Sequence, residues 1–525
     1  MIRDTISTTR QRVVGMFDSR TSRLRVEFVL KQLAISLAFI AFLISAVRSS
    51  AAQANDSPSE SWQVIHIGSQ RVGYQHVREH VEVRNKRKVF VSVGEVHFQL
   101  KRFGQDLNVS TSSRTEETET GELLRFVFEM KNPPAQVNRT EGIVSGSDLE
   151  VISTVAGKTD KKRMPWEPDA KSPGYPDRFL GTKPLKPGET FSCKVYAPER
   201  NKFSKVSFSA DEVRPVKLLD GKEHPLLKVK VSFATIPENN SRQFVDADGD
   251  VKLVELDMLG AVARLYEVTR EVALQAIAGR ELDLAVSTLV TLESPLPDAH
   301  RKKKIVYRIS TKEESPEGSF VSGGTQQIKR LSDSAIELTV TTKPLPPVNA
   351  RVVSTDAKYL AATRFLQSRD PAVAERADRA TAVETDQSRI AARMEKYVHD
   401  KLTKKNFSTA MASAAEVAEH MEGDCTEHAV LLAAMLRAKK IPSRIAAGLV
   451  YVESLQAFGG HMWTEAFLAG EWVPLDATLG RGGIGAAHLK MAESAMDEDS
   501  PLPVTTFLPL FNVLGKLKIE VVKVE

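Results

Sequence analysis

Between Ser61 and about Thr291 the chain alternates apolar and polar residues in short runs, and this pattern constrains the fold most strongly. Period-two alternation puts apolar side chains on one face of a strand, and runs separated by Gly, Pro, Asn and Asp build antiparallel sheets. The clearest runs are KVFVSV (88–93), LRFVF (124–128), FSCKVY (191–196) and LLKVKVSF (226–233). The pattern predicts an antiparallel β-rich domain over residues 61–300. Within it, the Pro-, Gly- and Lys-rich stretch 165–188 is predicted to be a long loop.

Alternating acids in this region, in the sequence FVDADGDV, suggest a calcium loop at first sight. Asp246, Asp248 and Asp250 could supply oxygen ligands, but an EF-hand loop requires Gly at its sixth position and Glu at its twelfth. Val251 and Asp257 stand there instead. Because Asp-Gly is a strong hairpin signal, the sequence favours a tight turn between two strands.

Composition changes along the second half of the chain, which at 525 residues is too long for one ordinary core. Residues 301–355 contain strand-like runs at 303–309 and 335–341 and then a Pro-rich linker at 343–347. From residue 356 to about 402 the chain is rich in Ala, Arg, Glu and Asp, which indicates helices, and 410–421 resembles another short helix. We therefore predict an α+β domain over residues 356–495, followed by C-terminal strands over 496–525.

The first 54 residues resemble an export signal. A basic stretch ends at Lys31, the apolar run LAISLAFIAFLISAV spans 33–47, and small residues with an Ala-x-Ala site at 52–54 follow. This order describes a secretory signal peptide, and the alternative is an uncleaved membrane anchor. We expect an exported protein, either periplasmic, secreted or anchored by this segment, with no other contact with the membrane.

The leader also accounts for the charge of the chain. The whole chain carries a net charge of +5, and residues 1–54 alone carry eight basic and three acidic residues. Residues 55–525 are therefore neutral overall, whereas binding to phosphate backbones requires a basic excess. We expect no nucleic-acid partner.

Cys425 occupies a position that suits a reactive thiol. The sequence GDCTEHAVLLAAMLR (423–437) begins with Gly and Asp as helix-start signals and continues as an apolar helix until Ile441-Pro442. Unpaired N–H groups at a helix N-terminus favour an anion, and cysteines there have lowered pKa values. Two structural alternatives stay open: a buried inert thiol, or a disulfide with Cys193, the other cysteine of the chain.

A base and an orienting acid are predicted downstream of Cys425. MWTEAFL (462–468) and EWVPL (471–475) are strands around an Ala469-Gly470 hairpin signal. If that pair is a two-residue loop, Leu468 faces Glu471, and His461 and Asp476 become diagonal neighbours on one face of the hairpin. This arrangement suits an imidazole oriented by a carboxylate.

These residues resemble the transglutaminase-like superfamily of the papain-like cysteine fold. The resemblance lies in GDCTEHAVLLAAMLRAKKIPSRIAAGLVYV and GGHMWTEAFLAGEWVPLDATL and covers roughly 356–489. It implies Cys425 as nucleophile, His461 as base and Asp476 as orienter. It also implies an α+β domain that acts on protein, peptide or cell-wall amides through a thioester. Some members of the family are calcium-dependent, but this sequence shows no credible calcium loop, so we expect no cofactor or metal. The upstream aromatic of the cross-linking members has only Phe407 as a counterpart.

Two other functions compete with this hypothesis. Cys425, His428 and His461 could be zinc ligands, with His420 or Asp424 as a fourth, because zinc prefers thiolate and imidazole. Alternatively, the domain is a catalytically inactive transglutaminase-like scaffold or binding protein. The sequence favours a cysteine hydrolase or acyltransferase and does not choose between hydrolysis and transamidation.

Overall fold

A computed structural model describes most of the chain after the predicted leader. The described residues are 58–102, 105–131, 137–155, 157–198, 201–234, 236–258, 261–277, 282, 289–312, 315–349, 353–404, 412–497 and 516–525. The predicted signal segment 1–54 and Phe407 lie outside them. None of the described helices combines the length and the apolarity needed to cross a bilayer.

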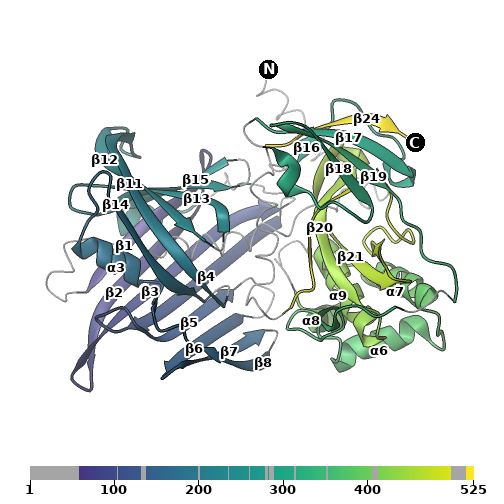
Figure 1. Ribbon diagram of the computed structural model, residues 1–525, viewed down its shortest axis with the longest axis horizontal. Coiled ribbons are helices and arrows are strands. Elements are labelled where there is room, and N and C mark those ends of the chain that lie inside the picture. Colours follow the sequence, from purple (N-terminus) through teal and green to yellow (C-terminus); the bar gives the residue numbers. More distant parts are fainter. Residues whose placement is uncertain are drawn as a thin grey trace.

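The first half of the described chain forms one sheet of 15 strands, seen in the left half of Figure 1. The spatial order runs from β8 to β1 and then from β15 down to β9. Each printed pair is antiparallel except β9 with β10, which is parallel. The strands are β1 (Ser59–Ile67), β2 (Gln70–Arg84), β3 (Arg87–Arg102), β4 (Gln105–Glu117), β5 (Leu123–Lys131), β6 (Asn138–Ser145), β7 (Asp148–Val155), β8 (Lys158–Pro165), β9 (Ala170–Lys171), β10 (Thr190–Ala197), β11 (Lys202–Lys217), β12 (Glu223–Phe233), β13 (Ile236–Val245), β14 (Val251–Met258) and β15 (Ala261–Val268).

The predicted β-rich character of this region is confirmed, and the four alternating runs lie within β3, β5, β10 and β12. The acidic turn joins β13 to β14, where Asp246 Oδ1 accepts the N–H groups of Asp248 at 3.0 Å and Asp250 at 2.9 Å. The loop prediction for 165–188 was wrong in part, because helix α3 (Tyr175–Thr182) lies inside it. Proline in the first turn of α3 starts this helix rather than breaking it.

The second half of the chain combines two smaller sheets with helices (Figure 1). The five-stranded sheet has the order β16-β21-β20-β23, and β22 also pairs with β21. Its strands are β16 (Val290–Thr291), β20 (Ser443–Val452), β21 (Ala457–Leu468), β22 (Glu471–Leu475) and β23 (His488–Ser494). The four-stranded sheet has the order β18-β19-β17-β24, with β17 (Lys304–Ser310), β18 (Gln326–Ser332), β19 (Ala335–Thr341) and β24 (Lys518–Val524).

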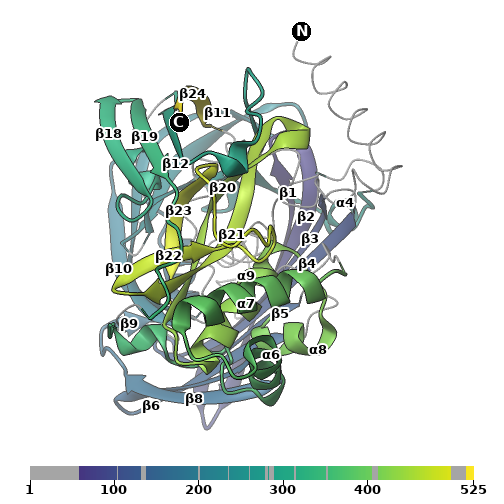
Figure 2. The same ribbon diagram turned by 90° about the vertical axis from the view of Figure 1, so that its right-hand side faces the viewer.

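The longer helices gather beside the five-stranded sheet, as Figure 2 shows. They are α6 (Pro371–Thr381), α7 (Gln387–Lys401), α8 (Ala414–His420) and α9 (Cys425–Ala438). Shorter helical turns are α4 (Arg270–Ala273), η3 (Ala299–Arg301), η4 (Pro316–Ser319), η5 (Ala357–Tyr359) and η6 (Glu453–Leu455). Helix α9 is buried from Cys425 to Arg437, so it forms the centre of this part of the molecule.

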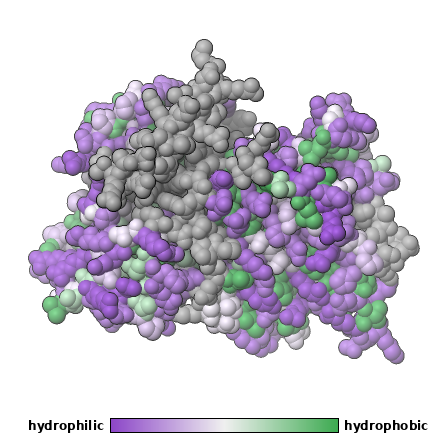
Figure 3. All heavy atoms as spheres, turned by 180° about the vertical axis from the view of Figure 1, so that it is seen from behind, coloured by the Kyte–Doolittle hydropathy of each residue, from purple (hydrophilic) through white to green (hydrophobic). Residues whose placement is uncertain are grey.

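The largest apolar core cluster of the described residues connects the two halves of the chain. It contains Phe98 and Leu265 from the large sheet, Tyr307 from β17, Leu431 from α9 and Leu449 from β20. On the face seen in Figure 3, the described surface is mostly polar, with apolar residues scattered among polar ones. The predicted fold class is therefore confirmed: an antiparallel β-rich region is followed by an α+β region.

Candidate active site

The hairpin β21–β22 has the register that the sequence predicts. Leu468 pairs with Glu471 and Thr464 pairs with Leu475. Ala469 and Gly470 form the two-residue turn with φ values of 53° and 87°. Positive φ at both central residues is typical of the tight turns that match the twist of two paired strands.

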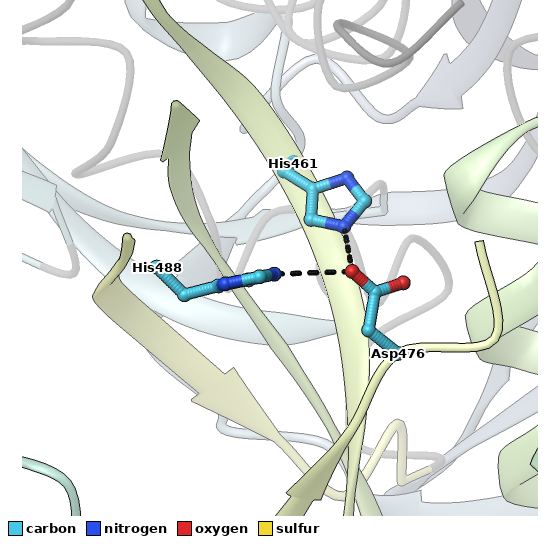
Figure 4. Close-up of side chains that lie close together, drawn as sticks. All are labelled: His461, Asp476 and His488. Carbon is cyan, nitrogen blue, oxygen red and sulfur yellow. Dashed lines mark hydrogen bonds and ion pairs between the residues drawn. The ribbon is translucent and has the colours of Figure 1, made fainter. Parts of the chain in front are cut away.

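This register brings His461 and Asp476 together. His461 lies on β21, and Asp476 directly follows β22. The Nε2 atom of His461 lies 2.9 Å from Oδ2 of Asp476, and both residues are 1% exposed. Figure 4 shows the two side chains pointing toward each other. A buried hydrogen bond between an imidazole and an ionised carboxylate is among the stronger kinds, and it fixes the orientation of the ring.

The carboxylate of Asp476 is held on both of its oxygens. Oδ1 accepts the backbone N–H groups of Thr478 at 2.9 Å and Leu479 at 3.3 Å. Oδ2 accepts from His461 and also from His488, at 2.9 and 3.0 Å. Burial acts to raise the pKa of Asp476, but the two histidines overcome this effect and hold it well below its usual value. Asp476 is therefore an ionised acceptor at neutral pH.

His488 is a member of this cluster that the sequence analysis missed. It begins β23 and is 1% exposed. On β20, Gly448 pairs with His461 and Val450 pairs with His488, so alternation places the two rings on the same face of the sheet. The sequence offers only a histidine at the start of a short apolar run, and its role depends on the pairing of β20 with β23.

A second residue that the sequence analysis missed is Glu395 on α7, whose side chain hydrogen-bonds the backbone of Asp476. Its Oε1 atom accepts the N–H of Asp476 at 2.9 Å and that of Gly483 at 3.1 Å. Burial raises the pKa of Glu395 to about 7, although these hydrogen bonds act to lower it. Glu395 lies 81 residues from Asp476 in the sequence, so no local pattern connects the two.

The start of α9 is built around Cys425 by a capping box. The side chain of Asp424 accepts the N–H of Thr426 at 3.0 Å, and Glu427 Oε2 accepts the N–H of Asp424 at 3.0 Å. Gly423 precedes the cap with a φ of 148°, and a Cβ there would lie 2.4 Å from the side chain of Glu427. The Gly-Asp-Cys sequence thus has a steric reason for its glycine and a capping reason for its aspartate.

Two side-chain hydrogen bonds set the direction of α9 along the sheet. The Thr464 hydroxyl on β21 donates to the carbonyl of Ala429 at 2.9 Å. One helical turn later, the carbonyl of Ala433 accepts from Ser443 at 2.8 Å, and Ser443 pairs with Ala466 on β21. Helix α9 and strand β21 therefore advance in the same direction, and the Cys425 end of the helix lies toward the half of β21 that carries His461.

Both cysteines are free thiols, so the disulfide alternative is wrong. Cys193 lies on β10 in the large sheet and is half-buried, whereas Cys425 is buried at the start of α9. Burial, together with the charge of Asp177, raises the pKa of Cys193 to about 12. Cys193 is therefore a protonated, unreactive thiol at neutral pH.

The histidine and carboxylate donors do not converge as the zinc alternative requires. In the described part of the chain, the donors that come within reach of a single ion are His461, Asp476 and His488. His428 instead uses Nδ1 on the carbonyl of Asp424, one turn earlier in its own helix. The contacts between His461, His488 and Asp476 have ordinary hydrogen-bond lengths, and an ionised carboxylate between two N–H donors accounts for them.

Two tryptophans lie on the strands of this hairpin. Trp463 is buried and lies parallel to the His461 ring, with ring centroids 6.0 Å apart. Trp472 contacts Arg444, whose guanidinium carbon lies 4.1 Å from the ring centroid. The Trp463 ring is packed into the protein, whereas the Trp472 ring is half-buried against Arg444.

Comparison with known proteins gives one family match, in the second half of the chain. Residues 374–477 match the transglutaminase-like superfamily. A search of curated proteins gave no match.

Three solved structures show more distant similarity. A candidate cysteine protease from Cytophaga hutchinsonii is 16% identical, with 42% of this chain and 86% of that chain covered and a TM-score of 0.26. The periplasmic domain of TgpA from Pseudomonas aeruginosa, bound to ethylmercury, is 13% identical, with 34% and 91% covered and a TM-score of 0.22. A β-barrel-like protein of a domain of unknown function from Brucella abortus is 8% identical, with 40% and 96% covered and a TM-score of 0.30.

The matched range contains Cys425, His461 and Asp476, and it ends before His488. Residues 374–477 are therefore similar to the transglutaminase-like superfamily.

Proposed function

We propose that this protein is an exported cysteine-dependent amide hydrolase or acyltransferase, with Cys425 as nucleophile, His461 as base and Asp476 as orienter. The observation that carries the proposal is the buried 2.9 Å hydrogen bond between His461 and Asp476, on the strand along which α9 runs. Cys425 begins that helix, where backbone N–H groups favour an anion.

The hydrogen bonding defines how a proton would move. Since Nε2 of His461 is bonded to Asp476, proton exchange with a thiol would use Nδ1. The Cys425 thiol gives its proton to Nδ1, and the thiolate attacks the carbonyl carbon of an amide. The oxyanion that forms accepts a hydrogen bond from the Cys425 N–H and from one further donor.

Collapse of this intermediate breaks the carbon–nitrogen bond. The protonated His461 gives its proton to the departing amine, which leaves an acyl thioester on Cys425. Water or a second amine then attacks the thioester carbonyl, His461 removes the proton of the attacking group, and Cys425 is restored as a thiol. Water gives hydrolysis, and an amine gives transamidation.

Hydrolysis is the favoured outcome. The acidic sequence that resembled a calcium loop is a hairpin turn, so it gives no support to a calcium-dependent cross-linker. The substrate class is a protein, peptide or cell-wall amide. The signal-like segment 1–54 supports export to the periplasm, the membrane surface or the medium.

Thiol labelling tests the proposal directly. We expect iodoacetamide, a small reagent suited to a residue that is 2% exposed, to label Cys425 at pH 7 faster than an ordinary thiol such as glutathione. Cys425→Ser should remove this fast phase, while Cys193→Ser should keep it because Cys193 is protonated. His461→Gln should slow labelling by roughly tenfold or more, in line with the loss of a general base.

The opposite outcome defines the scaffold alternative. If the folded wild-type protein shows no fast thiol between pH 6 and pH 8, the domain is a non-catalytic binding protein. Mass spectrometry of a thioester trapped on Cys425 after incubation with candidate peptides would report the nucleophile and the acyl donor together.

A further inference from the structure

His488 contacts Asp476 in the same way as the proposed catalytic histidine does. Its Nε2 atom lies 3.0 Å from Oδ2 of Asp476, and His461 Nε2 lies 2.9 Å from the same oxygen (Figure 4). A carboxylate oxygen can only accept, so each ring must carry its hydrogen on Nε2. One oxygen therefore divides its negative charge between two N–H donors.

The surroundings of His488 keep it neutral and fixed. Burial lowers the pKa of His488, although Asp476 acts to raise it. The ring of His300 packs edge-on against that of His488 at 5.6 Å between centroids, and His300 Nε2 is held 2.8 Å from the carbonyl of Tyr451. Burial lowers the pKa of His300 to about 3, so this neighbour is neutral as well.

The charged groups around the pair come from several elements. Asp476 and Arg481, which follow β22, and His488 act on His300 of η3, and Asp476 also acts on Glu395 of α7. Lys490 lies two residues after His488 on β23. Lys490 forms ion pairs with Glu465 and Glu493, so its charge is compensated. Asp476 is thus the charge that acts most directly on both imidazole rings.

We propose that His488 is a positioning residue, which fixes Asp476 and limits how strongly that carboxylate stabilises the protonated form of His461. This inference rests on the proposed function, since it assigns His461 the role of base. Each N–H donor to Oδ2 withdraws charge from the other bond, so a neutral His488 makes Asp476 a weaker partner for an imidazolium. A general acid–base residue must both accept and release a proton, so a carboxylate that holds the imidazolium less strongly favours the release step.

His488 reaches Asp476 from outside the matched range. The match to the superfamily ends at residue 477, and His488 enters through β23, which pairs with β20. A Cβ at Gly448 on β20 would lie 1.9 Å from the carbonyl oxygen of Leu489, so the missing side chain allows β23 to lie this close. The approach of the two strands brings the His488 ring to the carboxylate.

The test follows the titration of His461 by NMR in full-length protein with ¹⁵N-labelled histidine. A Cys425→Ala background removes the coupled thiol, and His461 signals are assigned by their loss in Cys425→Ala/His461→Gln. We expect His488→Leu to move the titration midpoint of His461 to higher pH by about one unit, since an N–H donor to a charged group is lost. His488→Gln, which offers an N–H donor of similar reach, should restore the midpoint to within about 0.3 unit of the parent.

The outcomes separate this inference from the proposed function. An unchanged midpoint in His488→Leu, or the same shift in Leu and Gln variants, would show that His488 is only a packing residue. If His488→Leu does not fold, His488→Asn replaces it, because its shorter side chain cannot reach Oδ2 and should give the same upward shift. A fast Cys425 thiol with an unmoved midpoint refutes this inference alone. A slow thiol in the wild type refutes the proposed function, and a midpoint that still moves in His488→Leu then shows only that His488 acts on His461 through Asp476.

Discussion

At the scale of single residues, Glu395 is a buried acid that has no role in the proposed reaction steps. Its carboxylate holds the backbone N–H groups of Asp476 and Gly483, and its pKa is raised to about 7 by burial. Through these hydrogen bonds, Glu395 fixes the chain segment that carries Asp476. The cost of ionising it in the folded state must appear in the pH dependence of stability.

We predict that Glu395→Gln flattens this dependence. As pH rises from about 4.5 to about 7, the unfolded chain ionises Glu395 and the folded protein does not, so the free energy of unfolding falls in this window. The shift corresponds to about 3 kcal/mol at most. Urea unfolding at pH 5 and pH 8 should therefore show the variant gaining stability over the wild type at pH 8. The control Glu375→Gln, at an exposed position, should differ from the wild type in free energy of unfolding by the same amount at both pH values. The same result for Glu395→Gln would contradict the prediction.

At the scale of elements, the hairpin β21–β22 sets the geometry of His461 and Asp476 and could be predicted from sequence. The register follows from a two-residue turn, which is a local property of Ala469 and Gly470. The start of α9 was predictable for the same reason, since its capping box lies within four residues of Gly423. Helix α3 was missed because the Pro and Gly residues around it are also typical of loops.

The turn of this hairpin carries strain that can be relieved. Ala469 has a φ of 53°, a conformation that costs a residue with a Cβ about 1–2 kcal/mol. We predict that Ala469→Asn raises the free energy of unfolding by about 0.5–1 kcal/mol, because Asn tolerates this region, while Ala469→Val lowers it. Thermal unfolding of both variants measures the effect. Labelling of Cys425 should stay at the wild-type rate, and loss of stability in the Asn variant would refute this account of the turn.

At the scale of the whole molecule, the transglutaminase-like domain depends on segments that precede it. β16 extends the edge of β21 next to the part that carries His461, and Leu296 donates its N–H to the Tyr451 hydroxyl at 3.0 Å. β24 near the C-terminus pairs with β17, and the Tyr307 hydroxyl of β17 donates to the carbonyl of Ala486 at 2.9 Å. These contacts make residues 289–349 part of the same folded unit.

We predict that a fragment starting at residue 356 is much less stable than one starting at residue 289, with both ending at 525. The shorter fragment lacks β16 to β19, which leaves β21 and β24 with unpaired edges and exposes apolar core surface. Circular dichroism melts and iodoacetamide labelling of both fragments would compare fold and site. Cooperative melting of the short fragment at the same temperature as the long one would contradict this dependence.

The sequence by itself determined those features of the fold that depend on residues close together in the chain. Alternation predicts the β-rich region, the cap predicts the start of α9 at Cys425, and the turn predicts the pairing that joins His461 to Asp476, because each depends on contacts within a few residues. The tertiary structure alone decided that His488 shares Asp476, that Glu395 supports it from a helix 81 residues away, and that the segment before the domain closes its sheet. These contacts depend on which strands pair and which helices pack together, and nothing in the local pattern around either residue specifies a partner so distant in the chain.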